Sequence, residues 1–236
     1  MDLELHDSES LIEGLKRSSS LWVDWRDGHA APTDTRYGEV ATRVGATDPT
    51  LGDDGWEFSG SNGWQLDMTD VAPRMTGLLY GFAVVEIASG GSHQEPMAWR
   101  AGSGAGDEGF HLRCNAGNTP LIETCNGVSE ATATVAGDVQ FGIPAVWNFL
   151  VWSGFAASLS WGVPSNASVV GGPPFSTDAA VPLYIGCGGG GNARLLSGSK
   201  IRGFGLWGSS QNNGTGDWKA EAIGRHFGSS NQPDVV

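Results

Sequence analysis

Short segments in which apolar and polar residues alternate dominate the chain. Residues 109–114 show this pattern most clearly. Successive side chains of a strand point to opposite faces, so Phe110, Leu112 and Cys114 are predicted to share one face. Residues 77–87 are instead apolar at nearly every position, which is typical of a strand buried on both sides.

Other segments of the chain predict further strands. They span residues 21–25, 56–58, 64–68, 97–100, 121–125, 130–135, 183–186 and 198–207, with a hairpin over 146–161. Residues 56–58 and 64–68 are expected to flank a tight turn. Residues 29–55, which are dense in Pro, Thr, Asp and Gly, are expected to be mostly loop. About a dozen short strands separated by turns indicate an all-β fold, a two-sheet antiparallel jelly-roll sandwich.

The N-terminal residues follow a helical pattern instead. Leu11, Ile12 and Leu15 lie on one face of a short amphipathic helix over residues 10–17, which begins with a capping box. A helix of about two turns is marginal alone in water, so its apolar face must pack on something. We predict that these three residues form an arm that docks on a neighbouring subunit. The alternative is that they pack on their own domain or fray.

The C-terminus predicts a second short helix. Asp217 can cap a helix over residues 218–227, with Gly228 as its C-cap. The expected organisation is an N-terminal arm at 1–20, one jelly-roll domain at 21–228 and a tail at 229–236.

Composition and charge exclude several classes of protein. Among 236 residues there are 37 glycines, about twice the usual share of ~7%, and this argues against a helical bundle. Lys and Arg number 13 against 26 acidic residues, for a net charge of -13. Such a surface repels phosphate, so no nucleic-acid partner is expected. No apolar run approaches the ~20 residues of a membrane span, so no membrane insertion is expected.

The cysteines and the N-terminus bear on where the protein is made. Cys114, Cys125 and Cys187 are an odd, low count, which argues against a secreted disulfide framework. We expect free, buried thiols, although Cys114 and Cys125 could also face each other across a hairpin. The first seven residues are acidic and lack an apolar signal region, so synthesis and maturation in a cytoplasm are expected.

The order of the segments resembles a known family. Residues 183–186, a glycine-rich loop, residues 196–207 and a short helix resemble the closing strands of laminin-G-like, concanavalin-A-like jelly-roll domains. Phe58-Ser59-Gly60 followed by Trp64 resembles an early hairpin of that family, and 77–87 its long core strand. The resemblance covers roughly residues 21–227 and leaves out 1–20 and 29–55.

The resemblance raises two chemical possibilities. Some family members are glycosidases, which need paired carboxylates at a fixed separation. Here Glu86 is followed two residues later by Ala88, so we predict no catalytic residues and no enzyme. Other members hold Ca²⁺ at the sandwich rim, where Asp53-Asp54 or Asp107-Glu108 could contribute. We prefer solvated loop acids there, and no zinc-type spacing exists. No metal site or cofactor is therefore predicted, with Ca²⁺ left open.

The ten tryptophans could serve the core or a ligand. Four lie in predicted strands and are expected in the core: Trp22, Trp64, Trp147 and Trp207. Trp152 and Trp161 flank one hairpin, and we predict that they are exposed and stack on a glycan.

A recognition fold without an export signal suggests a function by elimination. Bacteriophage and gene-transfer particles fold in a host cytoplasm and work outside it. We therefore predict a non-enzymatic virion structural protein that decorates a capsid or tail, with other virion proteins as partners. It would be a homo-oligomer and could contact host surface polysaccharide. The alternative is a bacterial carbohydrate-binding or adhesion module, followed by a degenerate glycosidase.

Overall fold

The computed structural model describes most of the chain. The described ranges are residues 8–75, 79–102, 107–128, 130–134, 138–152, 156–161, 165–170, 180–192, 194–208 and 217–228. Side chains are described throughout these ranges except at residues 8–9, 152–161, 165–170 and 217–221. The predicted tail at 229–236 and the first seven residues lie outside the described ranges.

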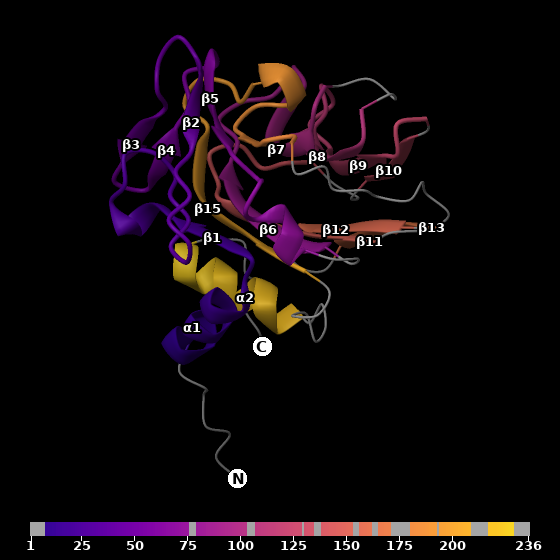
Figure 1. Ribbon diagram of the computed structural model, residues 1–236. Coiled ribbons are helices and arrows are strands. Elements are labelled where there is room, and N and C mark those ends of the chain that lie inside the picture. Colours follow the sequence, from indigo (N-terminus) through magenta and orange to yellow (C-terminus); the bar gives the residue numbers. More distant parts are fainter. Residues whose placement is uncertain are drawn as a thin grey trace, which may run out of the picture.

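An eight-stranded antiparallel sheet forms one layer of the molecule (Figure 1). Seven of its strands lie in the spatial order β13 (Ser165–Val170), β12 (Ala156–Trp161), β11 (Ala145–Trp152), β6 (Leu79–Glu86), β15 (Lys200–Trp207), β4 (Gly55–Glu57) and β3 (Thr50–Gly52). The eighth, β1 (Leu21–Asp24), also pairs with β15. The apolar run predicted as a doubly buried strand is β6, near the centre of this sheet, and only its last residue is partly exposed.

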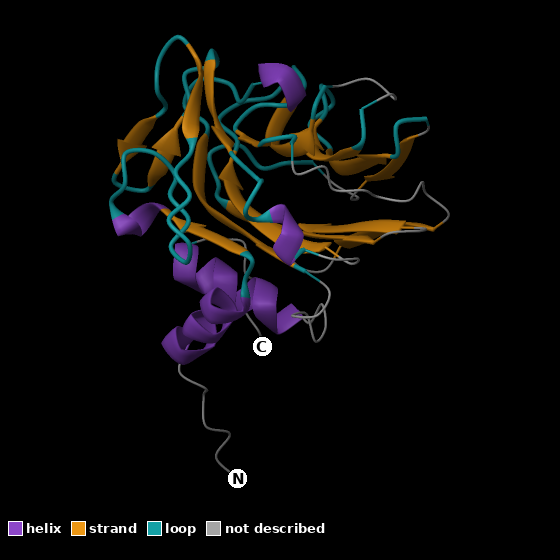
Figure 2. Ribbon diagram, in the orientation of Figure 1, coloured by secondary structure: helices purple, strands orange, loops and turns teal. Residues whose placement is uncertain are grey.

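A seven-stranded antiparallel sheet forms the second layer. Its order is β10 (Glu130–Thr134), β9 (Pro120–Cys125), β8 (Gly109–Cys114), β7 (Gln94–Arg100), β14 (Leu183–Ile185), β5 (Asn62–Leu66) and β2 (Thr42–Gly45). The two sheets face each other (Figure 2), and the main apolar core lies between them. Phe110, Leu112 and Cys114 of β8 all point into it, which confirms the face predicted from their alternation. The fold is therefore the predicted two-sheet sandwich.

Two helices cover the outer face of the eight-stranded sheet (Figure 1). They are α1 (Ser8–Ser18) and α2 (Asp217–Phe227), close to the helices predicted from capping residues. Between helices and sheet lies a second apolar cluster, which includes Ile12, Leu15, Trp22, Tyr80, Phe82, Val84, Val146, Trp207, Ala222, Ile223 and Phe227. Three single-turn 3₁₀ segments complete the described helices: η1 (Trp25–Asp27), η2 (Ala72–Arg74) and η3 (Gly189–Gly191).

The predicted docking arm packs on its own domain. Ile12 and Leu15 are 2% and 5% exposed within the outer cluster, and Leu11 is partly buried against it. The indole Nε1 of Trp207 donates to the Leu15 carbonyl at 3.2 Å, which satisfies one of the carbonyls left open at a helix end. The apolar face of α1 is thus occupied by the chain's own sheet, as in the alternative to docking on a neighbour.

Two expectations about residues 29–68 need correction. The segments 56–58 and 64–68 do not pair with each other, because β4 belongs to the eight-stranded sheet and β5 to the seven-stranded sheet. The turn residues correctly predicted that the chain reverses direction here, but not which strands pair. β4 pairs with β15 and β5 with β14, both far along the sequence. The expected loop at 29–55 also contains β2 and β3. Five of their seven residues are polar or glycine, so the sequence shows no apolar alternation that would predict strands there.

The cysteines are free thiols, and all three are buried. Cys114 pairs with Pro120 and Cys125 with Gly109, so the two cysteines sit at opposite ends of the β8–β9 pair. Burial raises the pKa of Cys114 to about 11 and that of Cys187 to about 12, which makes the thiols inert. In the described part of the chain, the helices are too short or too polar to cross a membrane.

Candidate functional site

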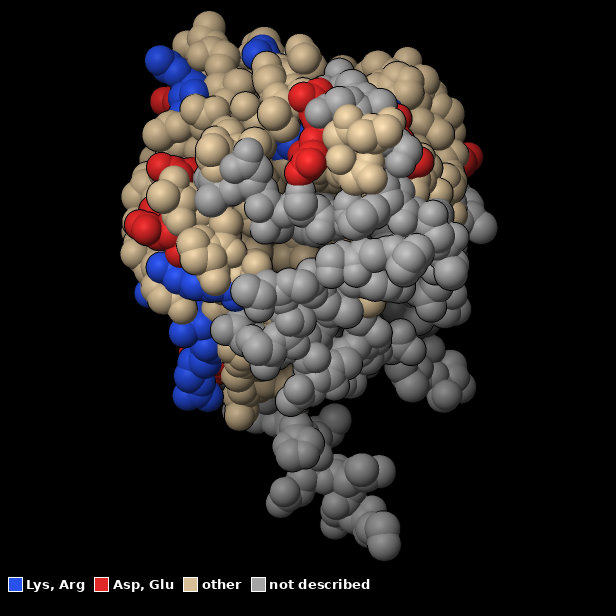
Figure 3. Space-filling model, turned by 45° about the vertical axis from the view of Figure 1, so that its right-hand side comes forward, with Lys and Arg blue, Asp and Glu red and all other residues tan. Residues whose placement is uncertain are grey.

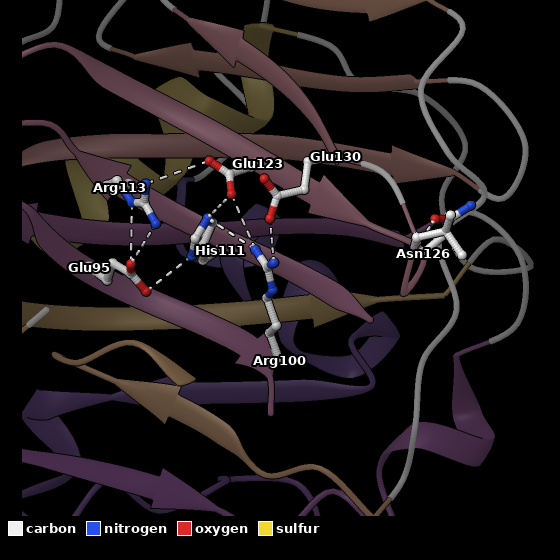
Figure 4. A network of polar contacts seen from close by, with 8 residues as sticks. Glu95, Arg100, His111, Arg113, Glu123, Asn126 and Glu130 are labelled. Carbon is white, nitrogen blue, oxygen red and sulfur yellow. Dashed lines mark hydrogen bonds and ion pairs between the residues drawn. The ribbon is translucent and has the colours of Figure 1, made fainter. Parts of the chain in front are cut away.

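The outer face of the seven-stranded sheet carries a network of charged side chains (Figure 4). Four adjacent strands, β7 to β10, supply its members. We call them the polar network: Glu95, Arg100, His111, Arg113, Glu123 and Glu130. Charged groups are rarely buried unless they are paired, so this cluster sets the sheet apart from the apolar faces elsewhere in the fold.

Strand register brings these side chains together. His111 alternates with the core residues of β8 and therefore faces outward, directly opposite Glu123 of β9. Arg100 of β7 lies opposite Gly109, which in turn lies opposite Cys125, the partner of Glu130. Because Gly109 has no side chain, the Arg100 guanidinium can cross β8 and reach the carboxylates of β9 and β10.

A β-bulge in β7 adds Glu95 to the network. The register slips between Gln94 and Met97, so that two residues, Glu95 and Pro96, lie opposite the single residue Arg113. Bulges often redirect a side chain. Proline cannot donate to the ladder of a regular strand, and a bulge is one of the few places in a sheet that accept it. The carboxylate of Glu95 consequently contacts both basic residues of β8.

A glycine-rich turn covers Glu95. Residues 188–192 close on themselves through a 2.6 Å hydrogen bond from the Gly188 amide to the Asn192 carbonyl. A Cβ at Gly188 would clash with Glu95 Oε2, so any larger residue would have to displace this carboxylate. The segment lies in the glycine-rich loop that the sequence shows between residues 183–186 and 196–207. The structure places it firmly against β7, where it keeps Glu95 at 2% exposure.

Arg100 and His111 hold the centre of the network. Arg100 is fully buried, and its Nη1 and Nη2 lie 3.2 and 2.6 Å from Glu123 and Glu130 respectively. His111 is also fully buried, with Nε2 3.0 Å from Glu123 Oε1 and Nδ1 3.1 Å from Glu95 Oε2. An imidazole with a carboxylate oxygen beside each nitrogen is best matched when both nitrogens carry protons.

Arg113 completes the network at its more open side. Its Nε and Nη2 lie 3.2 and 3.1 Å from Glu95 Oε1, and its Nη1 lies 3.6 Å from Glu123 Oε2. Figure 4 shows Arg113 between these two carboxylates. Each edge of its guanidinium is therefore engaged by an acidic partner.

Electrostatics balance the network when His111 is protonated. Burial alone would lower the pKa of His111, but the neighbouring carboxylates Glu123 and Glu95 raise it. Burial would raise the pKa of Glu123, yet His111, Arg113 and Arg100 lower it to about 2. Three cations then face three carboxylates, so the network as a whole carries no net charge.

The network becomes accessible at the sheet edge. Along β10, Glu130, Thr132 and Thr134 occupy alternate positions on the outer face, and all three are exposed. Figure 3 turns this side of the molecule toward the viewer and shows acidic side chains gathered near the top, with a separate basic group at the lower left. We call the polar network together with Thr132 and Thr134 the polar face.

The polar face suits hydrogen bonding better than acid–base catalysis. Carboxylates accept several hydrogen bonds and threonine hydroxyls donate and accept, which matches the hydroxyl groups of sugars. A glycosidase needs an acid whose pKa is raised toward neutrality. Glu123, the carboxylate at the centre, has its pKa lowered instead, so it stays ionised and cannot donate a proton.

The predicted glycan-stacking tryptophans lie elsewhere. Trp152 ends β11 opposite Ala156, whereas Trp161 ends β12 opposite Trp147, so the two residues stand at opposite ends of this hairpin. Their side chains lie outside the described residues, and glycan stacking there stays a prediction. The four tryptophans expected in the core, Trp22, Trp64, Trp147 and Trp207, are buried as predicted.

Glu86 and Asp54, two of the acidic residues considered from sequence, pair with basic residues outside the polar face. Glu86 belongs to the eight-stranded sheet and lies 3.3 Å from Arg202. Asp54 is engaged by Lys200 at 2.9 Å and by Arg202 at 3.4 Å. Among the described residues, His, Cys, Asp and Glu form no group of three that could hold a metal ion.

The polar network was not predicted from the sequence. The outward positions of residues 109–114 were available as a signal, because His111 and Arg113 alternate with three core residues. Their partners were not, since Glu95 depends on a bulge and Glu123 and Glu130 on the register of two further strands.

Solved structures resemble this fold, although no protein-family model and no curated protein matches the sequence. CBM40 of the Ruminococcus gnavus IT-sialidase, bound to α2,3-sialyllactose, has a TM-score of 0.55 and 15% identity, over 72% of this chain and 96% of that module. A Trypanosoma rangeli sialidase complex has a TM-score of 0.59 and 11% identity, over 91% of this chain and 33% of the sialidase. The botulinum neurotoxin DC binding domain, in complex with SialylT, has a TM-score of 0.60 and 9% identity, over 93% of this chain and 53% of that domain.

These likenesses define the class of fold. At 9–15% identity they show a lectin-like jelly-roll β-sandwich, in agreement with the family resemblance found in the sequence. This chain spans about a third of the sialidase and about half of the toxin domain, but nearly all of CBM40. None of these three structures is a virion protein. The predicted virion role, with its capsid or tail partners, homo-oligomer and location, stays a prediction.

Proposed function

We propose that this chain is a carbohydrate-binding module that engages a glycan at its polar face. The observation that carries the proposal is the extent of the match to CBM40. The chain corresponds to 96% of a binding module that was solved alone, but to only 33% of a sialidase. Nearly the whole of that module thus matches this chain, over 72% of its residues, and this supports a role as a binding module. This role was the second of the hypotheses drawn from sequence.

The polar face supplies the chemistry that such a role requires. Sugars present many hydroxyl groups and are held by a few well-placed charged and polar side chains. Glu130, Thr132 and Thr134 present acceptors and donors in one exposed row, and the buried part of the network holds Glu130 through Arg100. A ligand would meet side chains whose positions are already fixed, which lowers the entropy lost on binding.

A bulky substitution in this row tests the proposal. Thr132→Trp fills the polar face at an exposed strand position where an aromatic residue is well tolerated. Thr50→Trp is the matched control, because Thr50 is an exposed strand threonine of the other sheet. On a glycan array, and by calorimetry with the best ligand, we expect the wild-type chain and Thr50→Trp to bind equally and Thr132→Trp to lose binding.

Two outcomes would contradict the proposal. If the wild-type chain binds no glycan, with or without Ca²⁺, the module does not bind carbohydrate. If Thr132→Trp binds as tightly as Thr50→Trp, the glycan sits elsewhere, and Trp152 and Trp161 become the next positions to substitute.

A further inference from the structure

Both arginines of the polar network are already committed to carboxylates of the chain. Arg100 is fully buried between Glu123 and Glu130, at 3.2 and 2.6 Å. Arg113 uses one edge of its guanidinium for Glu95 and the other for Glu123. A guanidinium is the usual partner of a ligand carboxylate because its fork matches two oxygens. Here each fork already has a carboxylate partner.

An acidic sugar would therefore have to displace an internal carboxylate. Glu95 cannot turn into solvent without leaving its site, because the glycine-rich turn at Gly188 covers it and it is only 2% exposed. Releasing Arg113 from Glu95 would leave a buried carboxylate without that partner, which is strongly unfavourable. The group that does reach solvent, Glu130, is itself an anion, and the whole chain has a net charge of -13. Both facts oppose an anionic ligand.

Neutral sugars meet no such obstacle. A carboxylate that is paired with an arginine still has lone pairs that accept hydrogen bonds from hydroxyl groups. Thr132 stands next to Glu130 in the exposed row and can serve as donor or acceptor. Hydroxyl groups can thus be added to the network without breaking any of its ion pairs.

We infer that the polar face takes a neutral, hydroxyl-rich glycan and discriminates against sugars that carry a carboxylate. This inference rests on the proposed glycan-binding function and names the ligand class of the same site. It also separates this chain from CBM40, which is described in complex with a sialylated sugar. The difference lies in the internal carboxylates, which occupy the guanidinium groups that a carboxylate ligand would need.

The test compares glycans that differ only in an acidic group. The full chain is titrated with lactose and with α2,3-sialyllactose, and with neutral oligosaccharides and their uronic-acid counterparts, at low and at high salt. We expect the neutral member of each bound pair to bind at least severalfold tighter, with little dependence on salt. The Thr132→Trp variant should lose this binding, and Thr50→Trp should keep it.

A charge-removing variant sharpens the test. Glu130→Gln removes the exposed anion and loosens one partner of Arg100, so the preference for the neutral glycan should shrink severalfold. Glu57→Gln, at an exposed glutamate of the other sheet, is the control and should leave the preference unchanged.

Each remaining outcome is decisive. Tighter, salt-sensitive binding of the sialylated or uronic-acid member would overturn the inference and leave the glycan-binding function standing. An unchanged preference in Glu130→Gln would also overturn it, because neither the exposed charge of Glu130 nor its pairing with Arg100 would then disfavour the acidic sugar. Failure of every glycan to bind the wild-type chain would overturn the proposed function and the inference together.

Discussion

The outer faces of the two sheets differ sharply in chemistry. The eight-stranded sheet presents an aromatic and aliphatic surface, which α1 and α2 cover, and its ion pairs, such as Glu86 with Arg202, lie outside that apolar cluster. The seven-stranded sheet presents carboxylates, two arginines and a histidine, covered in part by the glycine-rich turn and exposed along β10. The same sandwich core lies behind both faces. Stability can explain the first arrangement, whereas the second needs another reason.

The contrast indicates which face carries function. Burying aromatic surface stabilises a fold directly, by roughly 25 cal/mol per Å² of apolar area. A buried ion-pair network gains little or nothing over apolar side chains of the same volume. The exposed row of β10 is the part of the charged face that solvent reaches, and the proposed glycan-binding function places its ligand there. Two substitutions, one on each face, test this division.

The largest effect is expected on the apolar face, at Trp22. Its ring is fully buried and lies 5.0 Å from Phe82, 5.9 Å from Trp207 and 6.0 Å from Phe227. Trp22→Ala should lower the free energy of unfolding by about 5 kcal/mol, near the top of the range for such truncations. Urea denaturation followed by circular dichroism measures the loss.

A conservative variant at the same site serves as control. The indole Nε1 of Trp22 has no hydrogen-bond partner among the described residues, so Trp22→Phe removes an unsatisfied donor and should destabilise much less than Trp22→Ala. A Trp22→Ala protein as stable as the wild type would mean that the helical layer contributes little to the fold.

A smaller effect is expected on the charged face, at Arg100. Arg100→Met leaves Glu123 and Glu130 without their shared cation and should lower the free energy of unfolding by about 3 kcal/mol. The loss stays below that at Trp22 because Glu130 is 34% exposed and water can solvate it. Adding Glu123→Met replaces the buried carboxylate of Glu123 by an apolar side chain, so the free-energy cost of burying that charge disappears.

The double variant Arg100→Met/Glu123→Met separates stability from function. Replacing both partners by apolar groups should recover part of the loss seen in Arg100→Met. Under the proposed function, both variants should lose glycan binding. If the double variant were no more stable than Arg100→Met, apolar replacement would recover nothing, the ion pairs would serve the fold itself, and the contrast between the two faces would fail.

Sequence patterns predicted the parts of the fold that local rules govern. Strict alternation gave the core face of residues 109–114, and capping residues gave α2 with Gly228 in the left-handed conformation that ends it, at φ +67°. The two-sheet sandwich itself followed from many short strands between turns. These features depend on neighbours in the sequence, and neighbours are visible without a structure.

Long-range register decided what the sequence could not predict. The assignment of β4 and β5 to different sheets depends on β15 and β14, which lie more than a hundred residues away. The polar network likewise joins Glu95, in a bulge, to carboxylates on two further strands. Glycine at 188 was ambiguous for the same reason, because a flexible turn and a close cover over Glu95 need the same residue.

The smallest expected effect is on the pH dependence of the free energy of unfolding, which should differ between the two faces. Each face has a carboxylate whose pKa is lowered. For Asp24 of the apolar face, burial opposes the effect of hydrogen bonds from His226 and Arg26, which hold its pKa well below the usual 3.8. The pKa of Glu123 falls from 4.5 to about 2. Both contribute stability at higher pH that is lost as the pH falls toward their folded pKa values, so both faces weaken in acid.

Between pH 6.5 and 9, the usual pKa of a thiol, the charged face should also weaken as the pH rises. The pKa of His111 is raised above the usual 6.5 by its two carboxylate neighbours, so its contribution is complete below pH 6.5 and is lost as the pH rises through the folded pKa. Urea midpoints across the pH range should therefore decline on both sides of pH 4.5 to 6.5. His111→Gln should abolish this decline above pH 6.5 and also reduce the acid one, because His111 helps to lower the pKa of Glu123, whereas Asp24→Asn should reduce only the acid one. An alkaline decline that survives in His111→Gln would show that the imidazole is neutral between Glu95 and Glu123, and the charge balance of the polar network would have to be redrawn.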